Sequence, residues 1–169
     1  AHNLGACPIS LKQGRYSYRH DSVLRDLIIK LKSFLKEIPL TKPKKSIRVN
    51  FIKAGQNPPK KKTQPSGILH LSSDWIVLAD LDEDYIFPPQ IALTQLRPDL
   101  VIFSKTLKHV ILIELTCPCE ENMTNWHNTK LNKYAPLSKV IENNGWKVDL
   151  FGIEVGARGY VSTTVPKCL

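Results

Sequence analysis

Residues 97–116, RPDLVIFSKTLKHVILIELT, contain two uninterrupted apolar runs, at 100–103 and 110–113. Apolar runs separated by a few polar residues are typical of two buried strands joined by a short turn. An acidic residue flanks each run on its outer side: Asp99 opens the first, and Glu114 closes the second. The pattern predicts a β-hairpin with a carboxylate on each strand at the end away from the turn.

The register of this hairpin decides whether the two acids meet. If the turn is centred between Thr106 and Leu107, Asp99 lies directly opposite Glu114, with Cβ atoms about 4.5–5.5 Å apart. Two carboxylates at about 5 Å repel each other by roughly 3 kcal/mol at an effective dielectric constant of 20. A divalent cation such as Mg²⁺ or Mn²⁺ would remove that conflict. The alternatives are two solvated carboxylates, or a one-residue shift of the turn that separates them.

Periodic patterns on either side of the hairpin define the other elements. An apolar stripe from Val23 to Ile38 predicts an amphipathic helix that ends at Pro39, with Asp21 or Ser22 as its N-cap. The segments 46–52 (SIRVNFI), 74–81 (DWIVLADL) and 147–155 (KVDLFGIEV) predict strands, and 120–146 predicts a second helix, stopped by Asn144–Gly145 and kinked or divided at Pro136. The predicted order is α-β-β-β-β-α-β, an α/β fold with a mixed sheet flanked by helices.

Composition limits the functional classes. The chain has 169 residues and a net charge of +9, which fits one domain with a polyanionic partner such as DNA, or a charge that serves solubility alone. The lysine-rich loop Lys60, Lys61 and Lys62 is the best candidate for contacts to the DNA backbone. No apolar run approaches the ~20 residues of a membrane span, so no membrane partner is expected. Four irregularly spaced cysteines favour a reducing, intracellular environment.

Five segments in order carry a family resemblance. RPDL…IELT resembles the PD-(D/E)XK nuclease superfamily. Together with QGRYSYRHDSVL, IELTCPCEEN, KLNKY and GWKVDLFGIEVGARGY, it resembles the restriction-like endonuclease of LINE-type retrotransposons and their degraded relatives, as far as about Tyr160. The resemblance implies a restriction-endonuclease-like fold and a nuclear DNA endonuclease that nicks its target by phosphodiester hydrolysis.

The same resemblance implies the site residues. Asp99 and Glu114 would hold Mg²⁺ or Mn²⁺, with the backbone carbonyl of Leu115 as a further ligand. Asp21 is either a third acid at the metal or the N-cap of its helix. Thr116 occupies the position where the superfamily has its catalytic lysine.

In the retrotransposon branch, the lysine comes from the following helix. Lys130, Lys133 and Tyr134 share one face of that helix at spacings i, i+3 and i+4. Lys130 is favoured as the catalytic lysine because the tyrosine side of the motif should pack inward. Arg19, His20 and Arg97 are candidates for phosphate contacts.

The N-terminal residues suggest a longer chain. His2 and Cys7 have the spacing of the second half of a zinc knuckle, although two ligands cannot complete a tetrahedral zinc site. We therefore divide the chain into a knuckle remnant with linker (1–18) and an endonuclease domain (19–169), part of a retroelement polyprotein. Alternatives are a weak or inactive DNA-binding remnant and a domesticated protein-interaction module; a homodimer is compatible with all three.

Overall fold

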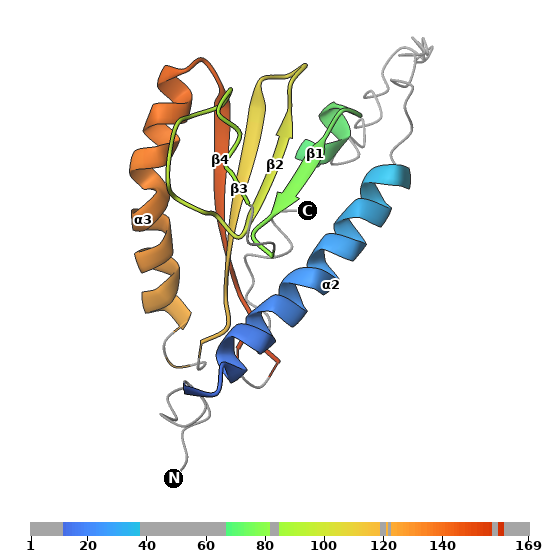
Figure 1. Ribbon diagram of the computed structural model, residues 1–169. Helices are drawn as coiled ribbons and strands as arrows, with labels where there is room; N and C mark the ends of the chain where they lie inside the picture. The colour runs from blue at the N-terminus through green and yellow to red at the C-terminus, as the bar shows by residue number, and fades with distance from the viewer. Residues whose placement is uncertain are drawn as a thin grey trace, which may run out of the picture.

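The computed structural model describes residues 12–37, 67–81, 85–118, 121, 123–156 and 159–160. Two helices and a four-stranded sheet make up this part of the chain (Figure 1). The elements are α2 (Arg15–Glu37), the 3₁₀ helix η1 (Ile68–Leu71), β1 (Ile76–Ala79), β2 (Leu100–Ser104), β3 (His109–Thr116), α3 (Met123–Asn143) and β4 (Lys147–Glu154). The α/β class is confirmed. The predicted strand at 46–52, the loop Lys60–Lys62 and the pair His2 and Cys7 lie outside the described residues.

The sheet is mixed, with the strand order β1-β2-β3-β4. The pairs β1–β2 and β2–β3 are antiparallel, whereas β3 and β4 are parallel because α3 carries the chain back between them. Leu100 pairs with Ile113, and Ser104 pairs with His109. This is the predicted hairpin register, so its turn is centred between Thr106 and Leu107.

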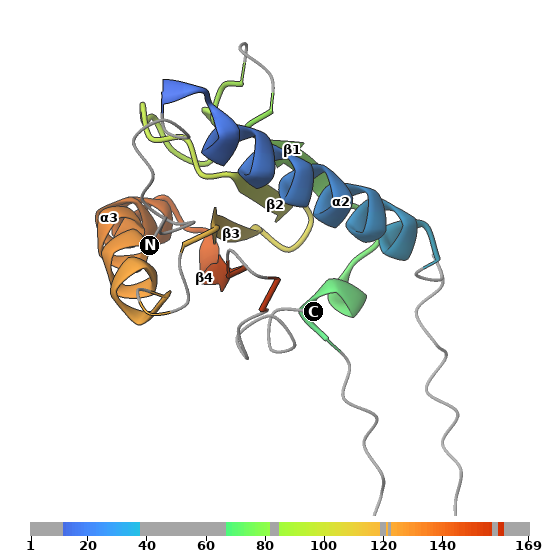
Figure 2. The same ribbon diagram turned by 90° about the horizontal axis from the view of Figure 1, so that it is seen from below.

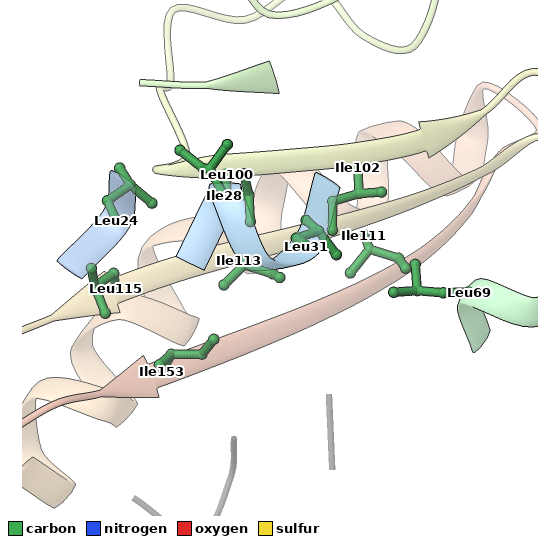
Figure 3. Close-up of a cluster of buried hydrophobic side chains, with 10 residues drawn as sticks. All are labelled: Leu24, Ile28, Leu31, Leu69, Leu100, Ile102, Ile111, Ile113, Leu115 and Ile153. Atoms are coloured by element: carbon green, nitrogen blue, oxygen red, sulfur yellow. The ribbon is translucent and has the colours of Figure 1, made fainter. Parts of the chain in front are cut away.

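The two helices cover opposite faces of the sheet (Figure 2). Leu24, Ile28 and Leu31 of α2 pack against one set of alternating strand residues, drawn in Figure 3. The buried residues of α3, which are Tyr134, Leu137 and Ile141, pack against the other set. Because β2 is buried on both faces, its run of five residues is apolar except for Ser104, rather than alternating.

Helix α2 begins earlier than the sequence predicts. Gly14 has a left-handed backbone (φ 66°), and its carbonyl accepts a hydrogen bond from the amide of Tyr18 at 3.0 Å. The N-cap hypothesis for Asp21 or Ser22 is wrong, because both residues lie inside the helix. Residues 15–18, assigned to the linker, also belong to α2. These additional turns carry His20, whose Nε2 contacts Asp99.

Helix α3 runs through Pro136 as one element, so the expectation that proline divides it is wrong (Figure 1). Pro136 lacks the amide that would bind the carbonyl of Asn132, but both residues are exposed, and water can satisfy that carbonyl. The predicted stop is confirmed. Gly145 is left-handed (φ 79°), and the amide of Trp146 donates to the carbonyl of Ile141 at 3.2 Å. No described helix is both long enough and apolar enough for a transmembrane span.

Candidate active site at the end of the hairpin

Asp99 and Glu114 lie side by side where β2 begins and β3 ends. The backbone amide of Asp99 donates to Oε2 of Glu114 at 3.3 Å, and the amide of Leu115 donates to Oδ2 of Asp99 at 2.7 Å. Glu114 alternates with the buried Leu112 and faces α3, whereas Asp99 lies just before β2 and is contacted by His20 of α2. Only 2% of the Glu114 side chain and 13% of the Asp99 side chain are exposed. The hairpin therefore fixes two nearly buried carboxylates next to each other.

Lys130 supplies the charge that opposes Glu114. Its Nζ forms an ion pair with Oε1 of Glu114. Lys133 instead donates to the hydroxyl of Tyr134 at 3.0 Å, and that hydroxyl donates to the carbonyl of Arg97 at 2.9 Å. The three residues share a helix face, and of the two lysines it is Lys130 that forms an ion pair with an acid of the hairpin. The inward packing of Tyr134, which is fully buried, turns Lys130 toward Glu114.

His20 lies between Asp99 and Asp21. Its Nε2 is 3.3 Å from Oδ2 of Asp99, and its Nδ1 is 3.1 Å from Oδ1 of Asp21. The hydrogen bond to Asp99 is the main cause that raises the pKa of His20 to about 9, although burial acts in the opposite direction. His20 is thus protonated at neutral pH. The imidazolium of His20 thus contacts both Asp21 and Asp99 and joins the two acids.

The oxygen donors at Asp99 and Glu114 suit a hard divalent cation, which commonly binds one or two carboxylates together with water and substrate phosphate. The amide of Leu115 points to Asp99, whereas the carbonyl of Thr116 accepts the amide of Val155 on β4 at 2.9 Å. Successive residues of a strand point their backbone groups to opposite sides, so the Leu115 carbonyl also faces the Asp99 side. Among the described residues, no three His, Cys, Asp or Glu side chains form a ready metal cluster. The donor set fits Mg²⁺ or Mn²⁺ with two carboxylates and one carbonyl.

The predicted phosphate-binding arginines have different surroundings. Arg97 forms an ion pair with Oδ1 of Asp80 at 2.5 Å and lies 5.6 Å from the ring centre of Tyr85. The buried Nη1 atom of Arg19 has no hydrogen-bond partner among the described residues. The same holds, within this part of the chain, for the buried hydroxyl of Thr116. Buried polar atoms without a partner are uncommon, and a bound water molecule or ion is one of the explanations for them.

Two site residues were missed in the sequence. His127 of α3 and Glu154 of β4 form an ion pair, with 2.6 Å between Nδ1 and Oε1. His127 precedes Lys130 by three residues, so helical spacing alone could have placed it on the same face. Glu154 had no such signal, because its burial depends on the helix that covers it.

A groove of about 570 Å³ between α2 and β1 lies away from this site. Its lining includes Arg25 and Lys32 but neither Asp99 nor Glu114. No family model, curated protein or solved structure matches this chain. The functional interpretation therefore depends on the geometry of the hairpin site.

Proposed function

We propose that this chain is a metal-dependent DNA endonuclease with a restriction-endonuclease-like fold, similar to the target-nicking domain of LINE-type retrotransposons. The observation that carries the proposal is the convergence of Asp99, Glu114 and Lys130. Two carboxylates from neighbouring strands meet a lysine that comes from the next helix, while the strand position for lysine holds Thr116. Two acids and one lysine are what phosphodiester hydrolysis requires of the protein.

Each residue has a distinct task in this proposal. A divalent cation bound by Asp99, Glu114 and the Leu115 carbonyl would lower the pKa of a water molecule and neutralise phosphate charge. Lys130 provides a positive charge in a fixed position, because its partner Glu114 is buried and water cannot replace the ion pair. That ammonium stabilises the extra negative charge on the phosphate as water attacks and the leaving oxygen departs.

DNA binding is proposed to use the basic residues around this end of the sheet. The protonated His20 supplies positive charge next to Asp99, and Arg19 precedes it in the same helix. Asp21 then serves as the partner that orients His20, more directly than as a metal ligand. Together with the net charge of +9, this positive charge favours binding to DNA phosphates that weakens as the salt concentration rises. A nuclear location, a longer retroelement polyprotein and a homodimer belong to the same proposal.

Plasmid nicking tests the proposal. Supercoiled DNA with Mg²⁺ or Mn²⁺ should become nicked circles, and Asp99→Asn and Glu114→Gln should each abolish this reaction. Asp26→Asn is the matched control, because Asp26 is an exposed acid of α2. Full nicking by Asp99→Asn would refute the site assignment.

A second candidate function is a DNA-binding domain without cleavage. It is favoured by one observation: each carboxylate already has an internal cation, His20 at Asp99 and Lys130 at Glu114. Salt-sensitive DNA binding by a protein that never nicks DNA at any Mn²⁺ concentration would identify this alternative.

A further inference from the structure

A second buried ion pair lies beside the hairpin acids. Glu154, the last residue of β4, has a side chain that is 4% exposed, and its Oε1 is 2.6 Å from Nδ1 of His127. A carboxylate buried to this degree is costly unless it is paired and hydrogen-bonded. His127 therefore supplies the partner that the buried Glu154 carboxylate needs, and this contact joins α3 to β4.

Gly152 makes this contact possible. A Cβ atom at Gly152 would lie 2.8 Å from Nδ1 of His127 and 3.0 Å from Oε1 of Glu154. A contact of 2.8 Å is shorter than real Cβ atoms make, so any side chain at this position would push the pair apart. In the ladder between β3 and β4, Gly152 pairs with Glu114. The ion pair thus sits one strand away from Glu114.

The position of Lys130 depends on what holds the first half of α3. All three buried residues of the helix, Tyr134, Leu137 and Ile141, come after Lys130. Before Lys130, the ion pair of His127 ties the helix to β4. His127 and Lys130 are one turn apart on the same helix face. The contact of His127 with Glu154 therefore also holds the helix turn that carries Lys130.

We propose that His127 and Glu154 form a positioning pair that holds the first half of α3 against β4, so that Lys130 reaches Glu114. His127 acts through its Nδ1 contact and does not touch the reacting atoms. The catalytic consequence of the pair rests on the proposed endonuclease function, but the placement of Lys130 does not.

Four substitutions separate positioning from chemistry. His127→Asn keeps an amide nitrogen near the place of Nδ1 and removes Nε2, whereas His127→Ala removes both. Gly152→Ala displaces the pair without changing either partner. Glu154→Gln keeps the shape of the side chain and removes its charge, which provides a mild variant if the alanine substitutions prevent folding. Asn128→Ala is the control, since Asn128 is an exposed neighbour on α3.

The first measurement needs neither metal nor DNA. Acylation of Lys130 by an amine-reactive reagent, followed by mass spectrometry, reports whether its Nζ remains on Glu114. We expect His127→Ala and Gly152→Ala to raise the Lys130 acylation rate several-fold relative to that of exposed Lys139, with His127→Asn and Asn128→Ala unchanged. Unaltered protection of Lys130 in both His127→Ala and Gly152→Ala would overturn the proposal.

The second measurement is the nicking rate. His127→Ala should lower kcat by roughly 10- to 10²-fold, the cost of a misplaced catalytic group, with KM for DNA unchanged and His127→Asn close to the parent rate. In a Lys130→Met background, His127→Ala should cause no further loss. A further loss there, or a His127→Asn variant as slow as His127→Ala, would overturn positioning in favour of direct proton transfer. If the parent protein does not nick DNA, the endonuclease proposal fails, and the acylation result alone decides the positioning pair.

Discussion

Substitution of Lys130 by methionine removes the ammonium and keeps most of the aliphatic stem, so it isolates the charge. Glu114 would then carry a buried negative charge without its lysine partner. Loss of one partner from a buried ion pair costs about 3–5 kcal/mol. Because 24% of the Lys130 side chain is exposed, water would reach the vacated place, and we expect a loss of about 2–3 kcal/mol in the free energy of unfolding.

Lys133→Met is the matched control for this substitution. Lys133 is exposed, and its Nζ contacts only the hydroxyl and ring of Tyr134 among the described residues. Its loss should cost less than about 1 kcal/mol. Addition of Glu114→Gln to Lys130→Met should restore much of the lost stability, because the uncompensated charge disappears with it.

Urea unfolding followed by tryptophan fluorescence measures these stabilities, and plasmid nicking measures the catalytic effect. Lys130→Met should nick about 10²–10³-fold more slowly, the usual cost of one preorganised charge-stabilising group, whereas Lys133→Met should nick near the parent rate. The assignment of Lys130 is refuted if Lys133→Met is the slower enzyme, or if Lys130→Met loses neither stability nor activity.

Three further substitutions test the surroundings of the site. The hydrogen bond to Asp99 raises the pKa of His20 to about 9, so the stability that His20 contributes to the fold is complete below about pH 6.5 and is lost as the pH rises through 9. Urea unfolding without metal should show this decline of the unfolding free energy in the parent protein and not in His20→Gln. An equal dependence of the unfolding free energy on pH in the two proteins would contradict it. Asp74→Ala removes hydrogen bonds of 3.0 and 2.8 Å to the turn after β2, so it should cost about 1–3 kcal/mol while nicking persists, because the turn lies at the other end of the hairpin. Tyr134→Phe removes the 2.9 Å hydrogen bond from the Tyr134 hydroxyl to the carbonyl of Arg97 and should lower the unfolding free energy by about 1 kcal/mol, as calorimetry would measure.

The sequence by itself determined the hairpin, because its two apolar runs have to be buried and are joined by a short turn. It left two registers open, and the structure has the one that places Asp99 opposite Glu114. These features are local, since strand period, turn length and the glycine stop at Gly145 depend on neighbouring residues. The same local reasoning failed at the start of α2, because the turns before Val23 have no apolar stripe, and the contact of His20 with Asp99 joins residues far apart in the sequence.

Only the tertiary structure decided which charges meet. The helical pattern favoured Lys130 over Lys133 because Tyr134 should pack inward, but only the structure shows that Tyr134 is buried and that Lys130 reaches Glu114. The pairing of His127 with Glu154 is likewise invisible in the sequence. Such contacts join residues far apart in the chain, and they depend on how closely α3 approaches β4, which is set by packing across the whole face of the sheet.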